Sequence, residues 1–449
     1  MAAGDRHNGY TAVAGLGATG LACVRHLRRR GEAVAVVDSR AEPPGLAQLR
    51  AEWPEVPAVV GALDRATLLG AERVVVSPGL DQRCGVLAEL RAAGRPVIGE
   101  LTLFAEAAEA PICAVTGSNG KSTVVTLLGE MARADGRDVA VGGNLGTPAL
   151  ELLEAAPRDG YVLEVSSFQL EACPGFRPRA AAVLNVSADH MDRYDDLSAY
   201  AAAKARILDG VETAVVNADD PWTAAMAGEG AGVRSFALSG GAAAGYRLVE
   251  ADGAAWLAAG DERRVAAAEL PVPGRAHCAN ALAAMALADA WGIGVAAQQA
   301  VLRRFTGLPH RMEPVGQWRG VQWINDSKAT NVGAAVAALE GLQRPVVLIA
   351  GGQGKGADFR PLAQACAEHA RAVILIGEDA AAIEAAVAGC APTERAAGMS
   401  DAVARAARWA APGDAVLLAP ACASFDAFTG FEQRGQAYRD AVLREVAHG

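Results

Sequence analysis

The sequence predicts an α/β protein of three domains, and two observations support this prediction. Short runs rich in β-branched residues alternate with alanine-rich stretches of helical character, and such alternation is typical of parallel sheets covered by helices. The chain has 449 residues, which is too long for one ordinary hydrophobic core and suggests about three domains of roughly 150 residues each.

The composition indicates a fully folded protein, with 52% hydrophobic and 20% charged residues. The net charge of −10 disfavours a general nucleic-acid-binding protein, because neutralising phosphates requires clustered lysine and arginine. A basic pocket for a small phosphorylated ligand is still compatible with this charge. None of the eight cysteines forms a C-x-x-C pair, no run of eighteen apolar residues occurs, and the first residues lack an apolar signal core. We therefore expect a cytoplasmic protein with reduced thiols and no membrane span.

The first domain is expected over residues 1–100 and begins with a strand, a glycine-rich turn and a helix. The strand and turn span 11–17 and the helix spans 21–31, while further strands are expected at 32–39 and 73–79. The turn reads GLGATG, and Asp38 ends the next strand. Taken alone, this is the fingerprint of a Rossmann-like dinucleotide site with Asp38 on a ribose hydroxyl, which an NAD-dependent oxidoreductase would fit. The same backbone also fits the diphosphate of a UDP-linked substrate, or tight strand–helix packing without a ligand.

The central domain, expected over 101–307, opens with a strand at 111–116 and the loop TGSNGKST. The first glycine of the full Walker pattern would fall at Val115, so the loop is shortened and its glycine is Gly117. Backbone N–H groups at the start of a helix can surround phosphate oxygens, Lys121 adds a positive charge, and Ser122 or Thr123 can offer a hydroxyl to Mg²⁺. A strand, a glycine loop and then an apolar helix together predict ATP binding. A P-loop domain is an unusual neighbour for a hydride-transfer site. Its presence therefore favours a UDP-linked substrate over NAD as the ligand of the first domain.

Further strands of the central domain are expected at 161–166, 180–187 and 213–217, with a helix at 278–291 and a small antiparallel addition within 236–270. Glu164 and His190 each follow a strand and could meet at a metal ion. Mg²⁺ prefers oxygen ligands, so this pair alone is an incomplete site, and a loop histidine is an equally good interpretation of His190. Lys204 lies on a later helix, where spacing alone suggests a surface charge.

The last domain is expected over 308–449, after a Gly/Pro turn at 305–315 that contains Arg311. Strands are expected at 321–327, 345–352, 372–377 and 415–420. Polar, charged and aromatic residues follow three of these strands: Asp326, Lys328 and Thr330, then Lys355, then Ser424 and Phe431. Because the carboxyl ends of parallel strands share one edge of a sheet, these residues predict a site for an anionic small molecule, with Arg311 close enough to reach a phosphate.

Seven stretches together carry a family resemblance: TGSNGKST, LEVSSFQLE, NVSADHMDRYDDLSAYAAAKARI, GLPHRME, INDSKATN, GGQGKGADF and PACASFDAFTGFEQRG. With these stretches the sequence resembles the Mur ligases over essentially the whole chain. The resemblance implies a Rossmann-like N-terminal domain that holds UDP, a central P-loop domain that binds ATP, and a mobile Rossmann-like C-terminal domain that closes over both.

The resemblance also implies an activity. It is the ATP- and Mg²⁺-dependent addition of D-glutamate to UDP-N-acetylmuramoyl-L-alanine (UDP-MurNAc-L-Ala), through an acyl phosphate, in the synthesis of peptidoglycan precursors. A ligase of the same family that uses another amino acid, such as L-glutamate, is the alternative. An NAD-dependent oxidoreductase and a non-catalytic nucleotide-binding module are rivals from other classes. We expect small-molecule substrates, no nucleic-acid partner and a monomer.

Site residues follow from matching the family motifs to this chain. The UDP substrate would contact Ala18, Thr19, Asp38, Ser39, Arg40, Gly79, Asn144 and Gln169. ATP would contact Gly117, Ser118, Asn119, Gly120, Lys121, Ser122, Thr123, Asn280, Arg311 and Asp326. The amino acid would contact Lys328, Thr330, Lys355, Ser424 and Phe431. The metal ligands would be Ser122, Glu164, His190 and a carbamylated Lys204, and the catalytic residues Lys121, His190 and Lys204.

Four residues depart from the family pattern. In GRAHCAN, Ala276 and His277 replace a His-Asn pair near the expected adenine contact, while Asn280 is retained. Gln353 stands where an acidic residue is common, and Ala419 replaces a frequent serine. The last two lie near the expected amino-acid site, so they concern the choice of amino acid rather than the ligase chemistry.

Overall fold

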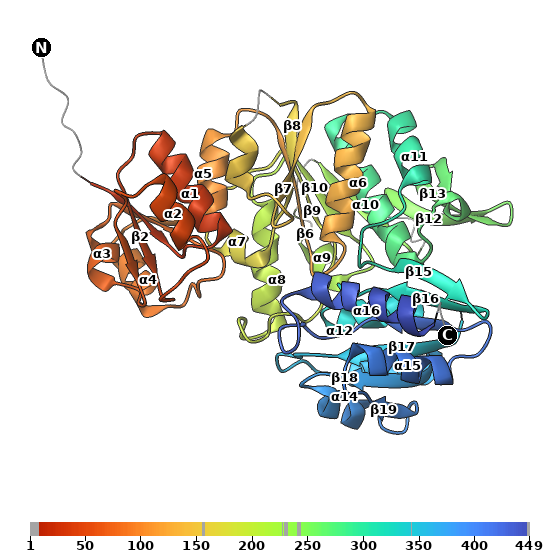
Figure 1. The fold of residues 1–449 in the computed structure, drawn as a ribbon. Coiled ribbons are helices and arrows are strands. Elements are labelled where there is room, and N and C mark those ends of the chain that lie inside the picture. The colour runs from red at the N-terminus through yellow and green to blue at the C-terminus, as the bar shows by residue number, and fades with distance from the viewer. Residues whose placement is uncertain are drawn as a thin grey trace, which may run out of the picture.

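The computed structural model describes residues 9–154, 158–226, 228, 232–239, 244–342 and 344–446. Figure 1 shows three lobes, with the N-terminal lobe on one side of the central lobe and the C-terminal lobe packed beneath it. Each lobe is built on a sheet of its own, and helices cover the sheets. The α/β class and the three-part architecture expected from the sequence are therefore present.

The N-terminal sheet is parallel, and within the described residues its strand order is β3-β2-β1-β4-β5. The strands are β1 (Thr11–Ala14), β2 (Val34–Asp38), β3 (Ala58–Val60), β4 (Arg73–Val76) and β5 (Val97–Gly99). The helices are α1 (Ala18–Arg29), α2 (Leu46–Glu52), α3 (Arg65–Gly70) and α4 (Gly85–Ala92), and α5 (Glu100–Ala107) leads into the central lobe. The strand order reverses between β1 and β4, and open sheets of this kind bind ligands at the carboxyl ends of the strands at such a point.

The central sheet has the order β14-β13-β12-β11-β10-β9-β6-β8-β7 among the described residues. Its strands are β6 (Ile112–Thr116), β7 (Val139–Gly143), β8 (Gly160–Glu164), β9 (Ala180–Val183), β10 (Thr213–Asn217), β11 (Val233–Ala237), β12 (Tyr246–Ala251), β13 (Ala254–Ala259) and β14 (Glu262–Ala266). The α-helices are α6 (Lys121–Ala134), α7 (Ser167–Glu171), α8 (Leu197–Ala205), α9 (Pro221–Ala225), α10 (Arg275–Trp291) and α11 (Val295–Arg304). Strands β12, β13 and β14 pair antiparallel, which confirms the small antiparallel addition predicted within 236–270.

The C-terminal sheet has the order β15-β16-β20-β17-β18-β19 among the described residues, and only the β15–β16 pair is antiparallel there. The strands are β15 (Glu313–Trp318), β16 (Val321–Asn325), β17 (Val346–Gly351), β18 (Ala370–Ile376), β19 (Thr393–Arg395) and β20 (Ala415–Leu418). The helices are α12 (Val332–Glu340), α13 (Arg360–His369), α14 (Ala380–Val387), α15 (Met399–Trp409) and α16 (Phe431–Glu445). The turn expected at 305–315 is correct up to 312, and β15 then begins at Glu313.

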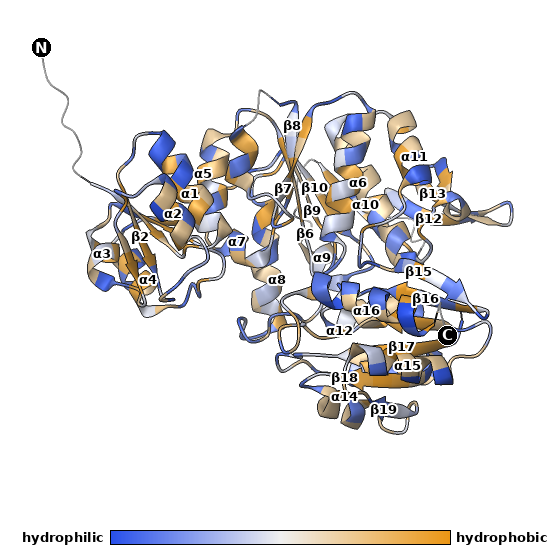
Figure 2. Cartoon of the chain, viewed as in Figure 1, coloured by the Kyte–Doolittle hydropathy of each residue, from blue (hydrophilic) through white to orange (hydrophobic). Residues whose placement is uncertain are grey.

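Burial explains why the strands read as continuous apolar runs. Strands β6, β8 and β9 are buried along their whole length, because helices cover both faces of the central sheet. Figure 2 shows the same pattern, with hydrophobic strands inside and hydrophilic residues on the outer helices. Helix α10 is buried on most sides, and its small alanines Ala281, Ala283 and Ala284 allow it to pack closely against its neighbours. No helix in the described part of the chain is both long and apolar enough to span a membrane.

Candidate active site

The loop between β6 and α6 takes a conformation that needs glycine at two positions. Gly117 has φ +151° and Gly120 has φ +86°, both in a region that other residues rarely adopt. A Cβ atom at Gly120 would lie 2.3 Å from Oδ1 of Asn280, which is on α10. The residue expected to contact ATP from α10 therefore lies directly beside the phosphate loop.

Lys121 begins α6, and its ammonium group lies over this loop. Its Nζ donates to the carbonyl oxygens of Gly117 at 2.8 Å and Ser118 at 3.0 Å. Burial lowers the pKa of Lys121, and the nearby charge of Arg311 lowers it further, whereas Glu164 opposes the shift. Because a helix N-terminus attracts anions, a lysine at this position strengthens a site for phosphate.

Glu164, at the carboxyl end of β8, accepts hydrogen bonds from two other segments of the chain. Its Oε2 accepts from Ser122 Oγ at 2.6 Å, and its Oε1 accepts from Asn144 Nδ2 at 2.7 Å. Burial raises the pKa of Glu164, but the charge of Lys121 and these two hydrogen bonds hold it below its usual value. Arg311 Nη2 donates to Ser122 Oγ at 2.7 Å. The turn that leads into the C-terminal sheet thus reaches the start of α6.

Lys204 on α8 is only 1% exposed, so the surface position suggested by spacing alone is wrong. Its Nζ donates to the carbonyl of Gly117 at 2.9 Å and lies 4.3 Å from the ring centre of Tyr200. Lys121 and Lys204 therefore share one acceptor oxygen. Burial lowers the pKa of Lys204 well below its usual value, and the neighbouring charge of Lys121 adds to this shift.

His190 lies in the loop between β9 and α8 and has an unusual backbone, with φ +58°. Its ring packs edge-on against Phe168 at 4.9 Å, and its Nε2 is 3.8 Å from Asp189 Oδ2. Burial lowers the pKa of His190, and Lys355 of the C-terminal domain contributes to the same shift. The imidazole is therefore favoured in its neutral form. No hydrogen bond between described residues joins His190 to Glu164 or Lys204.

The C-terminal domain adds further charges at the end of β16. The Nζ of Lys328 lies 3.8 Å from the ring centre of Phe431. Burial lowers the pKa of Lys328 to about 8, and the charges of Arg311 and Lys121 contribute. Asp326 accepts from the backbone N–H of Met312 at 3.1 Å, and burial raises its pKa to about 6. Lys328 and Arg311 of the C-terminal domain therefore lie within electrostatic reach of Lys121 in the central domain.

The remaining residues expected at the amino-acid site lie on the same side of the C-terminal sheet. Ser424 follows β20 and is 2% exposed, whereas Lys355 follows β17, is exposed and has φ +53°. Thr330 is half-buried, and its backbone N–H donates to the carbonyl of Lys328 at 2.8 Å. These residues lie after the carboxyl ends of β16, β17 and β20, as the sequence predicted.

In the N-terminal domain, the carboxylate of Asp38 is already occupied by protein donors. It accepts from the backbone N–H of Leu16 at 2.7 Å, and from the backbone and side chain of Arg40 at 2.7 to 2.9 Å. The Arg40 hydrogen bonds are the main reason that the pKa of Asp38 falls to about 2. Asp38 thus fixes the glycine turn and Arg40, rather than facing a ribose freely as in the dinucleotide interpretation. Arg40 and Ser39 are exposed beside it.

The other residues expected to contact the UDP substrate come after the carboxyl ends of strands in the N-terminal and central sheets. Ala18 is exposed at the start of α1 and Thr19 follows it, while Gly79 follows β4. Gln169 is buried, and its Oε1 accepts from the backbone N–H of Ser166 at 3.0 Å in a capping box that starts α7. Its side chain is therefore engaged within the protein.

Arg193 was not singled out from the sequence, although it lies in the stretch NVSADHMDRY. Its guanidinium lies 4.5 Å from the ring centre of Phe168, and it donates to the carbonyls of Gly79 at 3.4 Å and Leu80 at 3.3 Å. It therefore connects the His190 loop with a loop of the N-terminal domain. The one feature of the sequence that could have indicated a role for Arg193 is its position in the same motif as His190.

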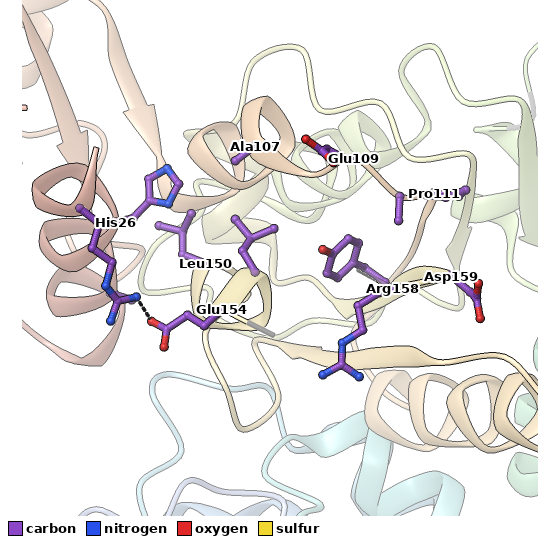
Figure 3. A pocket seen from close by; sticks show the side chains of 13 residues that line it. His26, Ala107, Glu109, Pro111, Leu150, Glu154, Arg158 and Asp159 are labelled. Carbon is purple, nitrogen blue, oxygen red and sulfur yellow. Dashed lines mark hydrogen bonds and ion pairs between the residues drawn. The ribbon is translucent and has the colours of Figure 1, made fainter. Parts of the chain in front are cut away.

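A separate cavity of about 830 Å³ lies between the N-terminal and central domains (Figure 3). Pro111 and Asp159, which line it, directly precede β6 and β8, so the cavity lies at the amino ends of these strands. Its other side is formed by α1, where the dashed line in Figure 3 joins Arg29 to Glu154. None of the predicted site residues lines this cavity, so it is not part of the candidate active site.

Three family models together match most of the chain. They are the Mur ligase MurD-like N-terminal domain at residues 10–99, the Mur ligase middle domain at 115–288, and the Mur ligase glutamate ligase domain at 310–422. The UDP-N-acetylmuramoylalanine–D-glutamate ligase of Nitrosococcus oceani is 51% identical over 436 residues, covering 97% of this chain and 96% of that one. The enzyme of the same name from Pseudomonas aeruginosa is 48% identical over 437 residues, covering 96% and 97%.

Solved structures share the fold at much lower identity. The UDP-N-acetylmuramate–alanine ligase MurC of Thermotoga maritima has a TM-score of 0.58 and 20% identity, covering 97% of this chain and 98% of that one. MurF of Acinetobacter baumannii has a TM-score of 0.61 and 18% identity, covering 97% and 91%. These similarities concern the fold alone.

Proposed function

The chain belongs to the Mur ligase family, and on that premise we propose that it is an ATP-dependent ligase that joins D-glutamate to UDP-MurNAc-L-Ala. The product is a precursor of peptidoglycan, and the bond formed is an amide. Relatives at 51% and 48% identity over almost the whole chain carry the name of this activity. The C-terminal family model, at 310–422, is described as a glutamate ligase domain.

One observation carries the chemical argument: charged groups of two domains meet at the start of α6. Arg311 reaches Ser122 at 2.7 Å, and its charge adds to the lowering of the pKa values of Lys121 and Lys328. Such mutual repulsion costs stability in the protein alone, and bound anions would relieve it. ATP phosphates and a substrate carboxylate are anions of this kind.

In the first step, a carboxylate oxygen of UDP-MurNAc-L-Ala attacks the γ-phosphorus of ATP, which gives an acyl phosphate and ADP. Two negatively charged groups must approach each other, so catalysis depends on positioning and on neutralising charge. Lys121 and the N–H groups of the glycine loop are placed for the phosphates. Arg311 and Lys328 bring further positive charge from the opposite side.

In the second step, the amino group of D-glutamate attacks the acyl carbon, and phosphate leaves. The amine must be neutral to act as a nucleophile, and the lowered pKa of His190 favours a neutral imidazole that would orient it. Lys328, Thr330, Lys355, Ser424 and Phe431 would bind the amino acid. The C-terminal domain, closed over the loop, would protect the acyl phosphate from water.

The residues expected to hold Mg²⁺ fit the ion in part as they stand. No group of three or more His, Cys, Asp or Glu side chains in the described ranges could hold a metal. Ser122 and Glu164 do offer adjacent oxygens, which suit Mg²⁺. Carbamylation of Lys204 would supply a further anionic oxygen ligand and would replace one of two ammonium groups at the Gly117 carbonyl with a negative charge. Bound by these residues and His190, Mg²⁺ would neutralise phosphate charge.

Two further proposals concern the setting of the enzyme. All eight cysteines are free thiols, which fits a reducing compartment, and we place the reaction in the cytoplasm. We also propose a monomer, because the site is assembled from the three domains of one chain.

A panel of amino acids tests the proposed function. The purified protein receives ATP, Mg²⁺ and UDP-MurNAc-L-Ala, and each amino acid is scored by the phosphate that it releases. D-Glutamate should be the preferred substrate. Preference for L-glutamate would assign the chain to a different specificity within the family. If no amino acid leads to phosphate release, the proposal is contradicted. A non-catalytic nucleotide-binding module would then be the remaining interpretation.

A further inference from the structure

The side chain of Asn331 serves two purposes in the structure. It caps helix α12, because its Oδ1 accepts from the backbone N–H of Ala334 at 2.9 Å. It also crosses to the central domain, where its Nδ2 donates to Asp189 Oδ2 at 3.0 Å and to Asn119 Oδ1 at 3.1 Å. In return, Asn119 Nδ2 lies 3.3 Å from Asn331 Oδ1. Asn331 is 6% exposed, so these contacts are shielded from water.

The central domain presents these partners in a fixed arrangement. The backbone N–H of Asn119 donates to Asn185 Oδ1 at 2.8 Å, and Ser118 Oγ donates to the carbonyl of Ser187 at 3.0 Å. The approach of the two domains is also close, since a Cβ atom at Gly333 would lie 2.9 Å from Ser187 Oγ. The first turn of α12 is therefore seated on a preformed surface.

The two partners of Asn331 both adjoin the reacting groups. Asn119 is two residues before Lys121 in the phosphate loop, and Asp189 is next to His190. On its own side, Asn331 directly follows Thr330 and is three residues after Lys328, two residues expected to bind the amino acid. One side chain thus joins the amino-acid site to the phosphate loop and to the His190 loop.

We propose that Asn331 is a positioning residue that latches the C-terminal domain onto the phosphate loop, so that glutamate meets the acyl phosphate in the closed enzyme. The inference rests on the proposed ligase function. Closed and open arrangements form an equilibrium, and contacts made only in the closed one shift its population. The hydrogen bond to the carboxylate of Asp189 is charge-assisted and is the strongest of the set.

A weakened latch has a chemical consequence that a loss of folding would not produce. In an open enzyme, water can attack the acyl carbon of the intermediate, the bond from that carbon to the phosphate oxygen breaks, and phosphate leaves with the substrate carboxylate restored. ATP is then consumed without forming an amide. The ratio of phosphate released to amide formed, which is one in a closed enzyme, rises above one.

Asn331→Ser separates the two roles of the side chain, because serine is a good helix cap but is too short to cross to the central domain. The matched control is Asp64→Ser, at the cap of α3, where Asp64 Oδ2 accepts from Thr67 N–H at 2.8 Å in the N-terminal domain. We expect Asn331→Ser to lower kcat by about tenfold and to raise the phosphate-to-amide ratio, with little change in the KM for ATP. The control should keep a ratio of one. A ratio of one and a near-normal kcat for Asn331→Ser would overturn the proposal.

Exchanging the charged and neutral side chains at 331 and 189 tests whether they interact directly. Asn331→Asp keeps the cap but sets a second carboxylate against Asp189, so it should lower kcat more than Asn331→Ser. Adding Asp189→Asn restores a donor–acceptor pair in the reverse direction and should recover part of the loss. Failure of the double variant to improve on Asn331→Asp would count against a direct latch.

Small-angle X-ray scattering tests the domain closure directly, without depending on catalysis. The probe is adenylyl imidodiphosphate with Mg²⁺, which fills the phosphate loop without reacting. The radius of gyration should be larger for Asn331→Ser than for the wild type, and equal radii would contradict the latch. If the wild type never releases phosphate, the proposed function fails while this comparison still decides the role of Asn331.

Discussion

At the scale of single residues, the site holds like charges together in a buried place. Lys121, Arg311 and Lys328 each have a lowered pKa with burial as the main cause, and neighbouring cations add to the shift of Lys121 and of Lys328. Groups of this kind cost stability in the folded protein and are typical of functional sites. We expect their removal to damage activity far more than folding.

Lys121→Ala removes the positive charge at the start of α6. A preorganised charge that neutralises the transition state supplies several kcal/mol, so kcat should fall by about 10³-fold or more. Steady-state phosphate release measures this, and the unfolding temperature serves as the control for folding. A nearly normal kcat would remove Lys121 from the proposed mechanism.

Lys204→Arg keeps a positive charge but cannot become a carbamate. If Lys204 is carbamylated, the variant should lose about a hundredfold or more in activity, because the site gains a cation where it needs an anion. The lowered pKa of Lys204 increases the fraction of neutral amine, which is the form that reacts with CO₂. Wild-type activity should therefore decline in CO₂-free buffer and return with bicarbonate. Normal activity of the variant would refute the carbamate.

At the scale of elements, the sequence predicted what local patterns determine. The strand β6, the glycine loop and α6 follow one another within about twenty residues, and each has its own signal. Strand β7 was not predicted, because two of its five residues are glycine, and β3 has only three residues. The site residues were predicted to lie close together because they follow strands that share an edge.

Helix α10 carries a test of pH-dependent stability. His277 on this helix stacks on Phe305 at 5.8 Å, and burial lowers its pKa to about 4. Among the described residues, its Nε2 has no hydrogen-bond partner. As pH falls below about 6.5, the unfolded chain takes up a proton at this histidine that the folded protein does not, so the free energy of unfolding falls until about pH 4.

Urea unfolding at pH 7 and pH 4.5 measures this effect. Between pH 7 and pH 4.5, the free energy of unfolding should fall by about 2 kcal/mol more for the wild type than for His277→Phe. The phenylalanine keeps the stacking but cannot be protonated. Equal losses for the two proteins would show that His277 does not resist protonation.

At the scale of the whole molecule, contacts between domains assemble the site. Arg311 and Asn331 bind the C-terminal domain to the phosphate loop, and Arg193 links the central domain to Gly79 of the N-terminal domain. The sequence could not predict the Asn331 contacts, because Asn119 and Asn331 are 212 residues apart and asparagine has many ordinary roles in turns and caps. The burial of Lys204 was missed for the same reason, since it depends on the packing of α8 against the loop.

Lys355 tests the contribution of the C-terminal domain to substrate binding. Its charge already acts on His190 of the central domain, so it lies within electrostatic reach of the site. Lys355→Ala should raise the KM for glutamate by about tenfold, through loss of a charged hydrogen bond, and should change the KM for ATP much less. Equal effects on the two KM values would place the amino-acid site elsewhere.

Oxygen transfer tests the central claim most directly, which is that a substrate carboxylate takes the γ-phosphoryl group of ATP. UDP-MurNAc-L-Ala is labelled with ¹⁸O at both oxygens of its carboxylate, and the phosphate released during ligation is analysed by mass spectrometry. An acyl phosphate intermediate predicts one ¹⁸O atom in each phosphate and the other in the amide product. Unlabelled phosphate, formed together with the amide, would contradict this account.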